Sequence, residues 1–198
     1  MGPKTNPSRT VVAMLSWLAS ACAEPLPAAK NVDIARFLGD WYVLGHIAAA
    51  SEKNAWNAVE SYRLRAETQD VVETTFTFRQ GAFDGPLETM RPTGYVSEGE
   101  TGRWGMHFYW WQGPFRFEYV IVDLDPSYQE VVIGRSARDY VWVMARTPTI
   151  SEASWTRLMG VVRKAGYEPA KVRRVPQRWG IEPDISPRER QPVLLQHR

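Results

Sequence analysis

Short segments in which apolar and polar residues alternate fill most of the chain between positions 41 and 146. A period of two is typical of strands that bury one face. The stretches between these segments are rich in Gly, Pro, Asp, Asn and Ser, which favour turns. The pattern predicts eight consecutive strands, over 41–48, 57–66, 71–80, 90–97, 104–111, 115–124, 128–135 and 139–146.

After the eighth strand the apolar period changes to that of a helix, which we expect over about 152–165. Thr149 precedes Glu152 by three residues, the spacing of a capping box at a helix start, and Gly166 is placed to end the helix. Residues 171–175 can add a short strand. The apolar stripe of the helix consists of Trp155, Leu158, Met159, Val162 and Ala165.

Eight strands on short connections, followed by one helix, indicate an all-β fold: an antiparallel up-and-down barrel with the helix packed outside. Closure removes the edges that an open sheet would expose. In such a barrel the first and eighth strands are neighbours, so Trp41 and Arg146 should meet at one closed end. A guanidinium over an indole contributes about 1–2 kcal/mol when shielded from water.

Three motifs in this order resemble the lipocalin family, and closely the bacterial outer-membrane lipocalins. They are "GDWY" (39–42), "GPFRFEYVIVDLD" (113–125) and "RDYVWVMARTPTIS" (138–151). The resemblance covers about 31–179. It implies that Gly39, Trp41 and Arg146 close one end of the barrel. It also implies binding, storage or transport of a fatty acid or lysophospholipid in the bacterial cell envelope.

Alternation and the predicted connections assign the ligand site. The connections near 48–56, 81–89, 112–114 and 136–138 form the open end, or mouth, and Trp111 and Phe115 add to its aromatic residues. Such positions are also typical of a filled core. The residues expected to line the barrel or its mouth are Val43, Ile47, Trp56, Phe76, Phe78, Phe83, Phe108, Trp110, Phe117, Tyr119, Tyr140 and Trp142. Polar groups near the mouth that could meet a ligand head group are Tyr109, Arg116 and Arg138.

The N-terminus has the pattern of an export signal over residues 1–21. Lys4 and Arg9 precede an apolar run that is too short to span a bilayer. The sequence "LASAC" resembles a lipobox, in which Cys22 is lipidated. The alternative is an incidental cysteine beside an ordinary cleavage site.

The remaining segments are interpreted as a tether over 22–31, a barrel domain over 32–176 and a disordered tail over 177–198. Ala23 after the cysteine fits the sorting pattern of lipoproteins sent to the outer membrane. We therefore expect a lipid-anchored protein on the periplasmic side of that membrane. If the tether leaves the barrel near its closed end, the mouth faces the periplasm.

Charge and candidate chemistry exclude several other functions. Of 24 basic residues two belong to the signal, which leaves 22 against 22 acidic residues and argues against nucleic acid as a partner. His46 and His107 lack metal-ligand spacing, and no catalytic motif or cofactor site is found. The chain is expected not to be an enzyme. The alternatives are a barrel enzyme acting on an apolar substrate and an envelope scaffold with a filled barrel, and the sequence leaves a homodimer open.

Overall fold

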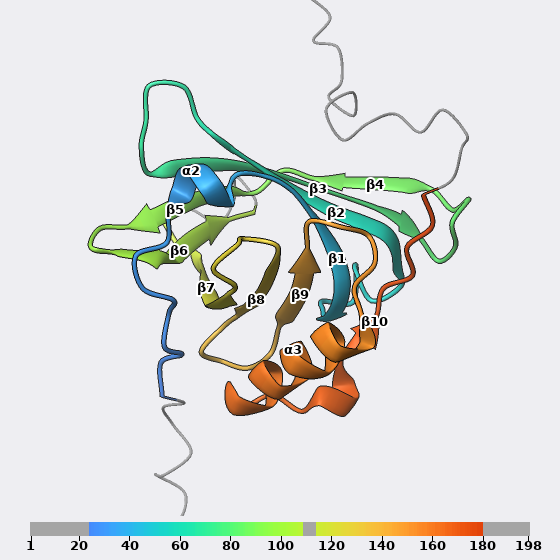
Figure 1. Cartoon of the computed structure of the whole chain (residues 1–198). Coiled ribbons are helices and arrows are strands. Elements are labelled where there is room, and N and C mark those ends of the chain that lie inside the picture. The colour runs from blue at the N-terminus through green and yellow to red at the C-terminus, as the bar shows by residue number, and fades with distance from the viewer. Residues whose placement is uncertain (1–23, 109–113, 180–198) are drawn as a thin grey trace, which may run out of the picture.

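The computed structural model describes residues 24–108 and 114–179 and contains one closed antiparallel sheet (Figure 1). The last long strand pairs back with the first, so the predicted antiparallel barrel with one helix outside is confirmed. The strands are β1 (Gly39–Ile47), β2 (Ala55–Leu64), β3 (Val71–Gln80), β4 (Leu87–Met90), β5 (Thr93–Ser97), β6 (Glu100–His107), β7 (Phe117–Leu124), β8 (Glu130–Gly134), β9 (Val141–Ala145) and β10 (Arg173–Arg174). The helical elements are α2 (Ile34–Phe37), α3 (Glu152–Lys164) and the short 3₁₀ helix η4 (Pro169–Lys171).

Two predicted strands differ from the observed ones. The fourth, predicted over 90–97, is divided into β4 and β5, which both pair with β3. Pro92 lies at the break because it has no N–H to donate to a ladder, and its carbonyl accepts the Thr74 N–H at 3.0 Å. The fifth, predicted over 104–111, begins at Glu100. Its hairpin needs only two residues, the second being Gly99 with φ +73°; residues 109–111 lie outside the described part.

The closed end of the barrel is built around Trp41, which is fully buried. The guanidinium of Arg146 lies 3.8 Å from the centre of the indole ring. It also donates hydrogen bonds to the carbonyls of Phe37 (3.0 Å), Leu38 (2.9 Å) and Asp40 (2.8 Å). These carbonyls lie at the end of α2 and the start of β1, and that of Phe37 also accepts the Trp41 Nε1–H at 2.8 Å. Arg146 therefore joins the last strand to the segment that covers the barrel base.

Helix α3 packs on the outer face of the barrel. Leu158 and Val162 are fully buried against Val120, Val132 and Val143 of the strands beneath. The predicted capping box at Thr149 is wrong: the N-cap is Ser151, whose Oγ accepts the Ser154 N–H at 3.0 Å. A serine directly before the helix satisfies this group, so Thr149 stays outside the helix. No helix among the described residues is long and apolar enough to cross a membrane.

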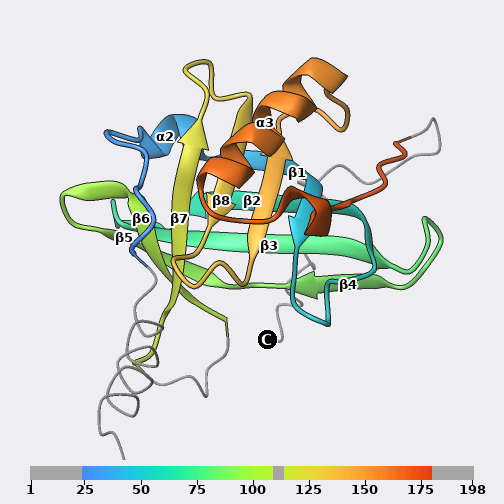
Figure 2. The same cartoon turned by 90° about the horizontal axis from the view of Figure 1, so that it is seen from below.

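The segment before α2 is not a free tether in its described part, which begins at Glu24. Leu26 is buried, and its N–H donates to Ser136 Oγ at 2.9 Å. Further along, the Ala29 N–H donates to the carbonyl of Ile121 at 2.7 Å. The segment follows β7 along the outer wall from the mouth to the closed end (Figure 2). The expectation that the chain leaves the barrel near its closed end is therefore wrong, because the apolar Leu26 side chain packs against the wall.

We predict that Gly102→Ala detaches this segment and leaves the barrel intact. A Cβ at position 102 would lie 2.3 Å from the carbonyl oxygen of Ala29, so the backbone of the segment must move. We expect a loss of about 1–3 kcal/mol of stability and faster hydrogen exchange at the Ala29 amide. The matched control is Gly160→Ala on the exposed face of α3, where nothing lies within 4 Å. Unchanged exchange at Ala29 in the Gly102 variant would contradict the prediction.

At the C-terminal side of the domain, the folded chain continues past residue 176, the predicted end of the barrel domain. The Gln177 amide donates to the carbonyls of Val43 (2.8 Å) and Ala58 (3.2 Å), and so bridges β1 and β2. The Arg178 N–H donates to Asn57 Oδ1 at 2.7 Å. The predicted start of the disordered tail at residue 177 is therefore wrong, because Gln177 and Arg178 are held by hydrogen bonds to β1 and β2. Residues 180–198 lie outside the described part.

Candidate ligand-binding site

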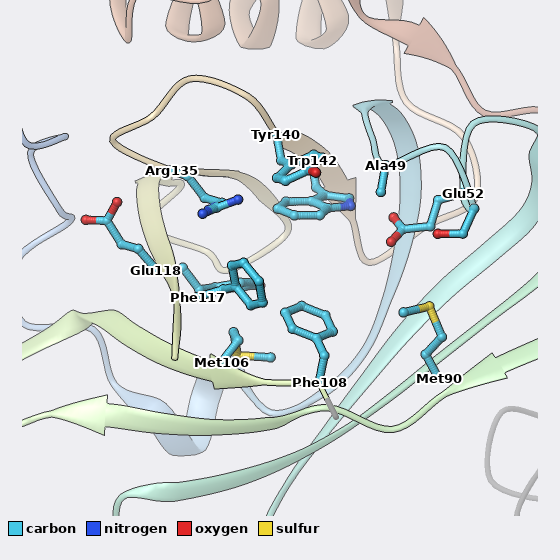
Figure 3. Close-up of a pocket in the computed structure, with 12 residues that line it drawn as sticks. Ala49, Glu52, Met90, Met106, Phe108, Phe117, Glu118, Arg135, Tyr140 and Trp142 are labelled. Carbon is cyan, nitrogen blue, oxygen red and sulfur yellow. The ribbon is translucent and has the colours of Figure 1, made fainter. Parts of the chain in front are cut away.

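A cavity of about 160 Å³ lies inside the barrel on the side of the mouth (Figure 3). Its wall comes from the β1–β2 loop, from β4, β6, β7 and β9, and from the β8–β9 loop. A recess of about 20 Å³ shares several of these residues and adds Glu60, Thr74 and Phe76. The residues lining the main cavity are Ala49, Ser51, Glu52, Met90, Met106, Phe108, Phe117, Glu118, Tyr119, Arg135, Tyr140 and Trp142.

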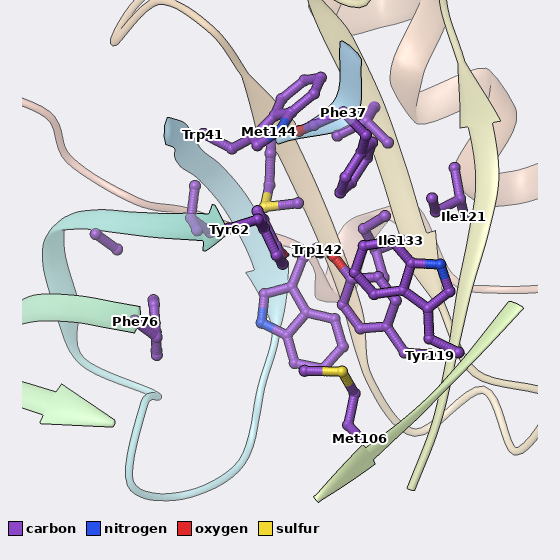
Figure 4. Close-up of a cluster of buried hydrophobic side chains, with 14 of the residues drawn as sticks. Phe37, Trp41, Tyr62, Phe76, Met106, Tyr119, Ile121, Ile133, Trp142 and Met144 are labelled. Atoms are coloured by element: carbon purple, nitrogen blue, oxygen red, sulfur yellow. Dashed lines mark hydrogen bonds between the residues drawn. The ribbon is translucent and has the colours of Figure 1, made fainter. Parts of the chain in front are cut away.

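The half of the interior next to the closed end is filled with aromatic side chains (Figure 4). Phe37 lies 5.2 Å from Trp41 and 5.3 Å from Trp104, and Trp104 stacks on Tyr119 at 5.3 Å between ring centres. Small-molecule sites usually measure about 300–1,000 Å³. The cavity is smaller than this range because these rings occupy the base, so it fits one narrow apolar chain better than a broad ring system.

The structure brings six of the twelve predicted lining residues to the cavity or its recess. They are Phe76, Phe108, Phe117, Tyr119, Tyr140 and Trp142. Val43 and Phe78 belong to the buried core instead. Trp56 and Phe83 contact each other at 4.6 Å between ring centres, away from the cavity wall. Trp110 lies outside the described residues, as do Tyr109 and Trp111.

Ile47 was predicted to face the ligand and packs instead with the outer cluster beneath α3. The ladder between β1 and β9 shifts between Val43 and Gly45, so the faces of β1 exchange there. Gly45 consequently faces α3: a Cβ on it would lie 2.6 Å from the Trp155 ring. His46 takes the inward position beside Trp142. A bulge of this kind leaves no signal in a pattern of alternation.

Buried acids at the cavity floor were missed by the sequence reasoning. Glu60 is only 7% exposed, accepts a hydrogen bond from the Tyr62 hydroxyl, and lines the recess. The Tyr62 hydroxyl lies 2.6 Å from that of Tyr119. Burial raises the pKa of Glu60 to about 7, more than the Tyr62 hydrogen bond lowers it, and nearby Glu52 raises it further. Glu60 shares the inward face of β2 with Tyr62, a signal that alternation could have provided.

The pKa of His46 is shifted in the opposite direction, downward. It is buried, and neither ring nitrogen has a hydrogen-bond partner among the described residues. Burial, followed by the charge of Arg173, lowers the pKa of His46 to about 4. The imidazole is therefore neutral at ordinary pH, and it occupies the inner wall of the barrel. Among the described residues no group of three or more His, Cys, Asp or Glu is placed to hold a metal ion.

Because the pKa of Glu60 is raised and that of His46 is lowered, we expect the two side chains to change the pH dependence of stability in opposite directions. The pKa of Glu60 rises from 4.5 to about 7 on folding, so stability is lost as pH rises through that range. The pKa of His46 falls from 6.5 to about 4, so stability is lost as pH falls through that range. Each contributes a slope of about 1.4 kcal/mol per pH unit where it is fully effective. Between pH 4.5 and 6.5 the two slopes should largely cancel.

Single substitutions should reveal each slope in urea unfolding at several pH values. For Glu60→Gln we expect the profile of stability against pH to tilt upward over this range relative to that of the unsubstituted protein, because the opposing contribution of Glu60 is removed while that of His46 remains. For His46→Asn we expect stability that falls with pH, because Glu60 remains together with Glu52, whose pKa is also raised by burial. Profiles of both variants that run parallel to that of the unsubstituted protein would contradict the assignment.

Arg135 is the basic group at the cavity wall. Its guanidinium lies 5.1 Å from the ring centres of both Phe117 and Tyr140, and its Nη1 pairs with Asp139 at 2.9 Å. Its Nε is buried and has no partner among the described residues. A carboxylate or phosphate entering the cavity could accept this hydrogen bond. The sequence reasoning missed Arg135 because its position in a turn gives no sign of its direction.

The arginines that were predicted for this role are used elsewhere. Arg138 donates hydrogen bonds to the carbonyls of Glu24, Ser136 and Ala165. Arg116 lies over the ring of Tyr95 at 3.5 Å, away from the cavity.

A second hollow, of about 300 Å³, lies outside the barrel, between α3 and the C-terminal segment. Glu152, Arg174 and Gln177 are among the residues that line it, so it is less suited to an apolar chain.

Comparison with known proteins gives a consistent result. Residues 32–177 match the family model of the lipocalin-like domain. The outer membrane lipoprotein Blc of Escherichia coli K12 is 26% identical over 165 residues, which cover 80% of this chain and 90% of that protein. The temperature-induced lipocalin-1 of Arabidopsis thaliana is 22% identical over 156 residues, covering 75% and 81%.

A solved structure shares the fold at much lower identity. Insecticyanin from the tobacco hornworm Manduca sexta aligns with a TM-score of 0.59 at 10% identity, covering 76% of this chain and 83% of that one. The barrel, the sealed base, the apolar cavity and the match over residues 32–177 together show that the chain belongs to the lipocalin-like family, whose members bind small hydrophobic ligands.

Proposed function

We propose that the protein binds one acyl chain of a fatty acid or lysophospholipid in the cavity, with the acidic head group at Arg135. The observation that carries this proposal is an apolar cavity whose wall holds Arg135, the buried Nε–H of which has no partner among the described residues. Each buried CH₂ of the ligand contributes about 0.8 kcal/mol. The aromatic side chains of Phe108, Tyr119 and Trp142 provide the surface for the chain.

Arg135→Gln tests the position of the head group. Palmitate and methyl palmitate have the same chain, but only palmitate carries a charge. We expect about a tenfold weaker affinity for palmitate, equal to about 1.4 kcal/mol, because a charge-assisted hydrogen bond is lost. The affinity for methyl palmitate should change little. Both are measured by displacement of a fluorescent fatty-acid probe.

Arg116→Gln is the matched control, since Arg116 is exposed and does not line the cavity. If the Arg135 variant weakened both ligands equally, the head group would not lie at Arg135. Failure of the unsubstituted protein to bind any probe would favour a scaffold with a filled barrel. Turnover of a lipid ester by the purified protein would favour the enzyme alternative.

We further propose that Cys22 is lipidated and holds the protein in the outer membrane on its periplasmic side. The "LASAC" sequence supports this, as does the likeness to proteins named outer membrane lipoproteins. Storage or transport of envelope lipids is the corresponding role. Native mass spectrometry of the protein from its host membrane tests both proposals, since it reports lipidation, retained ligand and any homodimer. An unmodified Cys22 would contradict the anchor.

A further inference from the structure

We propose that the mouth of the barrel rests on the phospholipid bilayer, so that ligand passes directly between membrane and cavity. The proposal rests on the proposed lipidation of Cys22 and adds the orientation of the anchored protein. It reverses the orientation expected from a tether at the closed end.

The first argument is the place at which the N-terminal segment joins the barrel. The carbonyl of Glu24 accepts a hydrogen bond from Arg138, and the Leu26 N–H donates to Ser136 Oγ at 2.9 Å. Both partners lie in the β8–β9 loop, at the mouth. Arg103 holds the same segment by donating to the Leu26 carbonyl at 2.7 Å. The chain is therefore fixed to the mouth from Glu24 onward.

The second argument is the length of chain left between this point and the anchor. Cys22 precedes Glu24 by two residues, which reach about 7 Å at most. The opposite end of the barrel is farther away, because β7 alone, with 8 residues, spans about 27 Å. To turn the closed end toward the membrane, residues 24–33 would have to leave the barrel wall. A lipid on Cys22 thus places the mouth next to the bilayer.

The third argument is the distribution of exposed side chains. The large hydrophobic residues that are exposed in the described part are Leu87 (47%), Phe115 (77%) and Phe117 (42%). All three lie at the mouth, in or beside the β3–β4 and β6–β7 connections. Exposed apolar residues gathered at one end are typical of a membrane or protein contact. The anchor nearby favours the membrane as the partner.

The turns at the closed end expose charged side chains, and none of the exposed large hydrophobic residues of the described part lies there. The β2–β3 and β5–β6 turns expose Glu67, Asp70 and Glu98. The mouth also exposes Asp84 and Glu88, so the exposed apolar residues, and not the acidic ones, distinguish the mouth from the closed end.

Photo-cross-linking on vesicles tests this orientation. The form left by the proposed processing, beginning at Cys22, has one cysteine, and its thiol is coupled to a maleimide phospholipid in vesicles of phosphatidylethanolamine and phosphatidylglycerol. Benzoylphenylalanine replaces Leu87 or Phe115 at the mouth, or Gln69 or Glu98 at the closed end, all of which are exposed. We expect lipid adducts from positions 87 and 115 at several times the yield from positions 69 and 98. Equal yields, or a higher yield from the closed end, would overturn the proposal.

A reversed anchor provides the reference yields for the opposite orientation. In this protein Cys22→Ser is combined with Glu98→Cys, so that the closed end is coupled to the lipid and position 69 becomes the cross-linking site nearest the membrane. The chemical anchor makes the result independent of processing in the host. Absence of lipid on native Cys22 would therefore contradict the proposed anchor, whereas the cross-linking pattern alone decides the orientation that an anchor at Cys22 imposes.

Discussion

Arg146→Ala is expected to destabilise the barrel by about 2–4 kcal/mol, because it removes a cation–π contact and several charge-assisted hydrogen bonds together. The substitution deletes the contact with the Trp41 ring at 3.8 Å. It also leaves the carbonyls of Phe37, Leu38 and Asp40 without their charged donor. The Phe37 carbonyl keeps its hydrogen bond from the Trp41 Nε1–H. Each buried carbonyl that is left without a partner costs about 1–3 kcal/mol, although these costs are not additive. Urea unfolding measures the effect.

Arg146→Lys separates charge from geometry at this site. Lysine keeps the positive charge but lacks the planar fork that reaches several carbonyls at once. We expect an intermediate loss of stability, about half of that in the alanine variant. A matched surface control is Arg65→Ala, which removes an exposed ion pair with Glu73 and should cost about 0–1 kcal/mol. If Arg146→Ala cost no more than Arg65→Ala, Arg146 would not seal the base.

Ala49→Trp is expected to abolish binding of a fatty-acid probe, with a loss of affinity greater than about 100-fold, or 2.7 kcal/mol. Ala49 lines the cavity from the β1–β2 loop. An indole at this position would occupy much of the cavity of about 160 Å³. Because the loop lies at the mouth and away from the sealed base, thermal stability should change little. Probe titration and a thermal melt measure the two quantities separately.

The neighbouring residue offers a matched control. Ala50 is exposed and does not line the cavity, so Ala50→Trp adds the same side chain to the same loop without filling the interior. We expect this variant to bind the probe as the unsubstituted protein does. Equal loss of binding in both variants would show that the loop, and not the cavity volume, controls the affinity. Unchanged binding in Ala49→Trp would place the ligand elsewhere.

The barrel could be predicted from the sequence because its strands, its turns and the helix that follows them each leave a local signal in the order of residues. Trp41 and Arg146 could be paired in advance, since closure of an up-and-down barrel makes its first and last strands neighbours. The division of the fourth strand at Pro92 could also have been predicted from the missing N–H. Each of these features follows from backbone geometry or from the order of the strands.

The ligand site was less predictable because the direction of a side chain depends on register. The bulge in β1 turns Ile47 outward and His46 inward, and nothing in the local sequence marks it. Arg135 lies in a turn, where alternation gives no direction. The contacts of Leu26 with the barrel wall depend on residues far along the chain, such as Arg103 at 77 and Ser136 at 110 positions away. These features come from tertiary packing, which a single sequence does not encode in any short pattern.

The central claim is that a barrel sealed at one end holds an acyl chain in its remaining hollow. A crystal structure of the protein with bound palmitate tests it most directly. We expect the chain to lie between Phe108, Tyr119 and Trp142, with its carboxylate next to Arg135. Palmitate in the hollow between α3 and the C-terminal segment, with side chains filling the barrel interior, would contradict the claim.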